Sequence, residues 1–80
     1  MRTAPQTFAP TLALFDGDAD EATVVARLVA LRGDPTWRVA LYQGDTRCAI
    51  ALTYRPTGEM YRLYLDRVTR PEGIVWRRAA

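Results

Sequence analysis

The densest group of side chains that could do chemistry is segment 16–21, DGDADE, which places four carboxylates within six residues. Asp16, Asp18 and Asp20 have the first, third and fifth spacing of a calcium-binding EF-hand loop. The rest of that motif is absent, because its sixth position is Glu21 instead of glycine and its twelfth is Arg27 instead of glutamate. We therefore expect no metal site in this segment.

The same four acids have two other roles open to them. Asp18 followed by Glu21 has the spacing of a capping box, and acids are favourable at the positive N-terminal end of a helix. Alternatively, Asp16, Asp18, Asp20 and Glu21 form an acidic knob that docks into a basic groove of a protein partner. Both roles remain expectations at this point.

The chain lacks the usual catalytic side chains. It contains no Lys, His, Ser or Asn, so all eleven positive side chains are arginine. It therefore has no serine or lysine nucleophile, no histidine base and no imidazole metal ligand, and no glycine-rich phosphate loop is present. The remaining carboxylates, tyrosines, arginines and the single Cys48 form no catalytic constellation. We expect a protein that is not an enzyme and needs no cofactor.

Arginine and tyrosine are instead the residue types that could bind a partner. Both are enriched at protein-binding hot spots, and both also stack on bases or pair with phosphates. We expect them to rim a shallow floor of Ala40, Ala49 and Ala51 on the outer face of a sheet, and the candidate contact residues are Arg38, Tyr42, Arg47, Arg55, Arg62 and Tyr64. A floor of small residues favours an occupant, which could be the N-terminal arm, a second copy, a protein partner or a nucleic-acid strand. A solvated face is the alternative.

These side chains must be positioned by segment 36–66, whose alternating apolar and polar residues predict three antiparallel strands. Gly44-Asp45 predicts a two-residue hairpin turn, which sets Leu41 opposite Cys48, Val39 opposite Ile50 and Trp37 opposite Leu52. Pro56-Thr57-Gly58 predicts the second turn. Matching apolar residues there sets Tyr54 opposite Tyr61, Leu52 opposite Leu63 and Ile50 opposite Leu65. We expect Cys48 on the buried face.

Three further elements flank this segment. Thr7–Phe15 is expected to be a short edge strand, because Leu12 and Leu14 alternate with smaller residues and Pro10 confines it to an edge. A helix is expected from about Ala19 to Arg32, stopped by Gly33 as a left-handed cap; its apolar stripe comprises Ala22, Val24, Val25, Leu28, Val29 and Leu31. A last strand, Ile74 to Arg77, should set Thr69 opposite Ile74, Val68 opposite Val75 and Asp66 opposite Arg77.

Length and composition set the limits of the fold. Eighty residues make one domain, which we place at residues 7–80 behind a flexible N-terminal arm at 1–6. The expected fold is α+β: one amphipathic helix packed on one face of a three- to five-stranded antiparallel sheet, in the order (β)αβββ(β). No segment approaches the roughly 20 apolar residues that span a bilayer, and one cysteine fits a reducing cytoplasm.

Charge favours a protein partner over nucleic acid. Residues 1–40 hold four Arg and five acids and residues 41–80 hold seven Arg and four acids, which gives +2 overall. Nucleic-acid modules usually carry a denser basic stripe. We therefore expect a small non-enzymatic protein-binding module in the cytoplasm. In its narrowest form it is an accessory or inhibitor protein of phages or mobile elements, for example an anti-CRISPR-like inhibitor of a host nucleoprotein complex. The alternatives are a nucleic-acid-binding domain that uses the Arg/Tyr face, and a homodimer.

Overall fold

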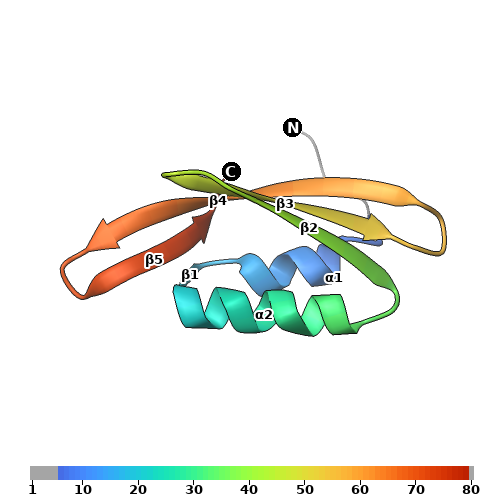
Figure 1. Cartoon of the computed structure of the whole chain (residues 1–80), viewed down its shortest axis with the longest axis horizontal. Coiled ribbons are helices and arrows are strands. Elements are labelled where there is room, and N and C mark those ends of the chain that lie inside the picture. The colour runs from blue at the N-terminus through green and yellow to red at the C-terminus, as the bar shows by residue number, and fades with distance from the viewer. Residues whose placement is uncertain (1–5, 80) are drawn as a thin grey trace.

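The computed structural model describes residues 6–79, and within them the chain forms a five-stranded antiparallel sheet with its helices against one face (Figure 1). The elements in chain order are α1 (Ala9–Leu12), η1 (Ala13–Phe15), β1 (Asp18–Asp20), α2 (Glu21–Gly33), β2 (Trp37–Gln43), β3 (Arg47–Tyr54), β4 (Glu59–Arg70) and β5 (Gly73–Arg78). The strand order is β1-β5-β4-β3-β2, so β1 and β2 are the edges. The predicted α+β class is confirmed. Residues 1–5 of the expected flexible arm lie outside the described residues.

The core lies between the sheet and the helices. Strand side chains alternate between the two faces, and the inner face contributes Trp37, Cys48, Ile50, Leu52, Leu63, Leu65 and Trp76. Helix α2 covers it with Val24, Leu28 and Leu31, whose spacing forms one side of a helix. The predicted stripe was too wide, because Val25 and Val29 are 50% and 63% exposed and Ala22 is exposed as well. A narrower stripe suffices because a second helical segment covers part of the same face.

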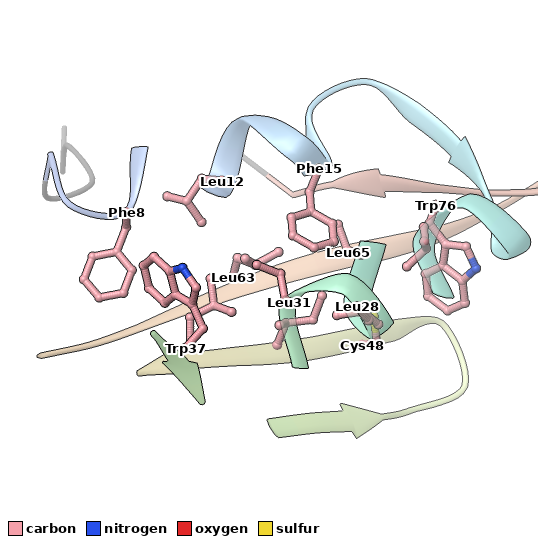
Figure 2. Close-up of a cluster of buried hydrophobic side chains, with 13 residues drawn as sticks. Phe8, Leu12, Phe15, Leu28, Leu31, Trp37, Cys48, Leu63, Leu65 and Trp76 are labelled. Atoms are coloured by element: carbon pink, nitrogen blue, oxygen red, sulfur yellow. The ribbon is translucent and has the colours of Figure 1, made fainter. Parts of the chain in front are cut away.

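That second segment is the largest departure from expectation, because residues 9–15 are helical and the predicted strand at Thr7–Phe15 is wrong. Phe8, Leu12 and Phe15 are spaced as on one side of a helix, and all three are buried (Figure 2). Pro10 lies in the first turn, where its missing N–H leaves no hydrogen bond unmade. Leu14, expected to share a face with Leu12, is 44% exposed. The first strand is instead β1, which pairs with β5.

The two predicted hairpin registers are each wrong by two residues. Leu41 pairs with Ile50 instead of Cys48, because Gly44 N–H donates to the Arg47 carbonyl at 2.9 Å and the chain reverses at residues 45–46. Ile50 likewise pairs with Leu63 instead of Leu65, across a turn at residues 55–58. A shift of two residues keeps every side chain on its predicted face. The other pairs on the inner face are Trp37–Tyr54, Val39–Leu52, Gln43–Cys48, Leu52–Tyr61, Tyr54–Glu59 and Cys48–Leu65.

Strand β4 joins the two halves of the sheet. Its pairing with β5 has the predicted register, with Asp66 opposite Arg77, Val68 opposite Val75 and Thr69 opposite Ile74. Residues 59–66 pair with β3 and residues 65–70 pair with β5. Leu65 and Asp66 are therefore the two positions of β4 that pair with strands on both sides.

The ends of α2 also differ from expectation. Its N-cap is Asp20 instead of Asp18, and the Asp20 carboxylate accepts a hydrogen bond from the Thr23 N–H at 2.8 Å. Gly33 is the last helical residue and does not have the positive φ of a left-handed cap. The turn into β2 depends on Asp34, whose side chain accepts from the Thr36 N–H at 2.9 Å and whose carbonyl accepts from the Trp37 N–H at 3.1 Å.

Candidate functional site

The face of the sheet that points away from the helices carries the predicted contact residues. Because directly paired residues point to the same side, the observed registers align them in rows across the strands. The rows are Arg38–Thr53–Met60, Ala40–Ala51–Arg62 and Tyr42–Ala49–Tyr64 on β2, β3 and β4, followed by Arg47–Asp66–Arg77–Asp18 on β3, β4, β5 and β1. The structure thus brings five of the six predicted Arg and Tyr residues onto one surface. The sixth, Arg55, is exposed at the β3–β4 turn at the end of this surface.

A shallow hollow of about 350 Å³ opens on this face, and we call it the outer hollow. Its lining residues are Arg38, Ala40, Tyr42, Ala51, Thr53, Met60 and Arg62. Two of the three alanines predicted to form a floor are among them, and Ala49 lies in the next row between Tyr42 and Tyr64. The hollow exists because Ala40 on β2 and Ala51 on β3 are small, whereas Arg38, Tyr42, Met60 and Arg62 around them are longer.

The outer hollow is positively charged. Its lining includes Arg38 and Arg62 and no acidic residue, and neither arginine forms an ion pair within residues 6–79. They stand on β2 and β4, which are two strand spacings or about 10 Å apart, and they lie in adjacent rows of the sheet. A ligand that brings carboxylates to both arginines and an apolar group to the floor would match this arrangement.

Aromatic and apolar side chains form the walls of the hollow and continue beyond it. Tyr42 is 60% exposed, and Met60 and Tyr64 are also exposed. Tyr64 is held from one side by Arg47, whose guanidinium carbon lies 5.7 Å from the ring centroid, within cation–π range. Arg47 in turn donates to the Asp66 carboxylate at 2.8 Å. Tyr64 is therefore a partly positioned side chain, of the kind that loses little freedom on binding.

The charged row beside the hollow is internally compensated. Asp18 on β1 accepts hydrogen bonds from Arg77 at 2.9 Å and from Arg70 at 2.6 Å. The hydrogen bond from Arg77 lowers the pKa of Asp18, and the nearby positive charges of Arg77 and Arg70 act in the same direction. The same bond raises the pKa of Arg77. Arg47 likewise forms an ion pair with Asp66, so the arginines of this row are neutralised by acids within the molecule. Arg38 and Arg62 have no such acidic partner among the described residues.

The acidic segment is largely occupied within the molecule. Asp16 forms an ion pair with Arg78 at 2.8 Å, Asp18 binds two arginines, and Asp20 caps α2. The hydrogen bonds from Thr23 lower the pKa of Asp20. Glu21 is exposed and forms no ion pair within the described residues. The docking of these four acids on a protein partner stays a prediction. Asp16, Asp18 and Asp20 would have to break their bonds within the molecule before they could contact a partner.

The arginines that bind these acids were not predicted. Arg70, Arg77 and Arg78 reach Asp16 and Asp18 because β1 adds to the edge of β5, a contact between residues about 60 positions apart. The surplus of arginine in the C-terminal half was the one sequence signal for it. A larger hollow of about 510 Å³ is lined by the Asp16–Arg78 ion pair and also by Arg62 and Tyr64.

Comparison of the chain with protein-family models, with curated proteins and with solved structures finds no match. Within residues 6–79, no three His, Cys, Asp or Glu side chains come together in a way that could hold a metal ion. Among the helices described, none has the length and hydropathy needed to cross a membrane.

Proposed function

We propose that this protein is a small non-enzymatic binding module whose outer sheet face takes an acidic segment of a protein partner. One observation carries the proposal: Arg38 and Arg62 flank a hollow with an alanine floor, and no acidic residue compensates their charges. Tyr42, Tyr64 and Met60 stand exposed around the same surface. Aromatic residues, Met and Arg are the types enriched where proteins bind one another.

Charge distribution supports a protein partner more than nucleic acid. Four other arginines, Arg47, Arg70, Arg77 and Arg78, are paired with acids. A phosphate backbone is held by many uncompensated positive charges, whereas the outer hollow offers two. Nucleic-acid binding through this face remains the alternative function, and the Arg/Tyr composition is the observation in its favour.

The narrower form of the proposal is an accessory or inhibitor protein of phage or mobile-element type that acts on a host nucleoprotein complex in the cytoplasm. Its support is the lack of a catalytic constellation and a free cysteine that fits a reducing compartment. Affinity capture from lysate of the native host, followed by mass spectrometry, tests this form. Recovery of a nucleoprotein complex is the expected result, and recovery of proteins unconnected with nucleic acids would contradict it.

The binding mode is tested with the partner segment itself. Peptides selected on immobilised protein from a random library should be enriched in Asp and Glu around an apolar or aromatic residue. Calorimetry with a selected peptide should show that Tyr64→Ala costs on the order of 2 kcal/mol if Tyr64 is a hot spot. Arg62→Glu should weaken binding further, because it places a like charge against the acidic peptide. Arg67→Glu is the matched control, since Arg67 is exposed but lies outside the outer face.

The alternative is tested with fluorescently labelled random oligonucleotides. We expect no useful affinity for single- or double-stranded DNA near 150 mM salt, which is about physiological. Micromolar or tighter binding that falls steeply with salt and is lost on Arg62→Glu would overturn the protein-partner proposal in favour of nucleic acid.

A further inference from the structure

Strand β2 presents an unprotected edge. Its ladder with β3 begins at the Arg55 N–H bond to the Thr36 carbonyl and ends at the Gly44 N–H bond to the Arg47 carbonyl. Hydrogen-bonded and non-hydrogen-bonded pairs alternate along an antiparallel ladder, so the backbone groups of Val39, Leu41 and Gln43 point away from the sheet. Natural edges are usually protected by proline, charge or a bulge. Between Trp37 and Gln43 the chain has no proline and one charge, Arg38.

The flank of α2 beside this edge is apolar. Val25 lines a small groove together with Leu41 and Gln43, which places this flank next to the edge of β2. Val29 lies one turn further on the same side of the helix. Leu41, although on the inner face, is still 38% exposed. The opposite flank of α2 is occupied, because Arg27 donates to the Leu14 carbonyl of the N-terminal helical segment.

Charges on this flank stand at its two ends. Glu21 is in the first turn of α2 and Arg32 in its last, and neither forms an ion pair within residues 6–79. Between them the exposed residues are Ala22, Val25, Ala26, Val29 and Ala30. A surface helix normally shows polar residues on its solvent side. We call the β2 edge and this flank of α2 the edge wall.

We propose that two copies of the chain associate through the edge wall, with β2 pairing antiparallel to β2 of the second copy and α2 lying antiparallel to α2 of the second copy. A two-fold axis through Ala40, the central residue of β2, pairs all seven residues of the strand. The pairs across the axis are Arg38 with Tyr42, Val39 with Leu41 and Trp37 with Gln43, each formed twice. No like charges oppose one another in this arrangement.

The helix flank is self-complementary in the same way. An antiparallel copy brings Glu21 of each chain toward Arg32 of the other, and it brings Val25 and Val29 against the apolar centre of the opposite flank. The two elements also match in length, since seven strand residues span about 23 Å and thirteen helical residues about 20 Å. This match of both charge and apolar residues with its own two-fold copy favours a second copy as the occupant over an unrelated protein.

The interface is small. Specific interfaces bury at least about 1,000 Å² in total, and a wall of one strand and one helix flank lies near that limit. We therefore expect a weak dimer, with a Kd in the micromolar range. Arg38 and Tyr42 line the outer hollow and also pair across the two-fold axis, so the variants that test the dimer change only residues of α2, which lie outside that hollow.

Sedimentation equilibrium over a concentration series tests the proposal directly. The wild-type mass should rise from 9.0 kDa toward twice that value as the concentration increases. Val29→Glu should remain monomeric with unchanged circular dichroism, because Val29 is exposed in the monomer. A wild-type protein that stays at the monomer mass up to about 1 mM, where even a weak dimer would form, overturns the proposal and leaves the edge wall to a different protein.

Charge reversal tests the antiparallel arrangement. Glu21→Arg and Arg32→Glu should each weaken the dimer on the order of tenfold, because each change disrupts two symmetric ion pairs. The double variant should restore the wild-type Kd. Melting curves at dilution check that each variant folds. Single reversals that leave Kd unchanged, or a double variant no better than either single one, would refute this arrangement.

Discussion

Replacing Phe8 by alanine tests whether the N-terminal helical segment is part of the core. Phe8 is completely buried, and its ring centroid lies 5.5 Å from those of both Trp37 and Tyr61. Truncating a buried phenylalanine costs about 3–5 kcal/mol, including the loss of its aromatic contacts. A domain of 80 residues has a total stability of roughly 4–12 kcal/mol. The variant should therefore lose about a quarter or more of its stability, and if the total stability lies near the lower limit it should be largely unfolded.

Urea denaturation followed by tryptophan fluorescence measures this loss, since Trp37 reports directly on the Phe8 contact. Leu14→Ala is the matched control, because Leu14 belongs to the same segment but is exposed and should change stability by less than about 1 kcal/mol. If Phe8→Ala lies within about 1 kcal/mol of the wild type, the segment does not pack on the sheet as described.

Three further predictions concern the strands and their charges. Cys48 is buried, and burial raises the pKa of its thiol. It should therefore react with a thiol reagent slowly in the native state and quickly in urea. Rapid labelling of the native protein would mean that Cys48 lies on the solvent-facing side of β3. Ile50→Asp should unfold the domain by burying an unpaired charge, whereas Ala49→Asp on the outer face should leave it folded, as circular dichroism would show; equal damage would mean that both faces are buried. The hydrogen bond from Arg77 lowers the pKa of Asp18 in the folded state. The ionised Asp18 therefore stabilises the fold at pH values above its unfolded pKa of about 3.9, and this contribution is lost as the pH falls through its lower pKa in the folded state. Melting temperatures of Asp18→Asn should accordingly fall less than those of the wild type between about pH 5 and pH 2, and parallel curves would exclude this contribution.

The two faces of the sheet were predictable from the sequence because strand side chains alternate with a period of two. Both hairpin registers were wrong by two residues, yet Ile50 and Leu52 still fell on the inner face and Arg38 and Tyr42 on the outer one. The turn position is harder to predict, because the Gly44-Asp45 pair has the residue types of the two central positions of a hairpin turn. Gly44 is instead the last paired residue before the reversal, with its N–H bonded to Arg47.

The N-terminal segment was misassigned because two patterns overlap in it. Leu12 and Leu14 alternate as in a strand, while Phe8, Leu12 and Phe15 have helical spacing, and burial follows the second pattern. The N-cap was misassigned for a different reason. Asp18 and Asp20 are both suitable caps, and Asp18 is drawn to Arg70 and Arg77 by contacts that no local pattern reveals.

The outer hollow was partly predictable. Its alanine floor and its Arg and Tyr rim follow from the alternation in segment 36–66, and the structure brings Arg38, Tyr42 and Arg62 around one hollow. Which arginines remain uncompensated could not be predicted, because that depends on the pairing of β1 with β5. That pairing brings Asp18 to Arg70 and Arg77, whereas Arg38 and Arg62 form no ion pair within residues 6–79.

The two-residue overlap on β4 has a consequence for how the sheet opens. The β4–β5 hairpin extends past the end of α2, so its tip around residues 68–75 is not covered by a helix (Figure 1). Amide protons there should exchange with solvent through local opening of that hairpin alone. Leu65 and Asp66 pair on both sides, but each N–H faces only one neighbouring strand, because the direction of the backbone groups alternates along an antiparallel ladder. The Arg67 N–H donates to the Thr46 carbonyl, so the Leu65 N–H, two residues earlier, faces β3, and the Asp66 N–H faces β5. The Leu65 amide should therefore record the opening of the β3–β4 ladder at the centre of the sheet, with a larger free energy than the amides of the hairpin tip.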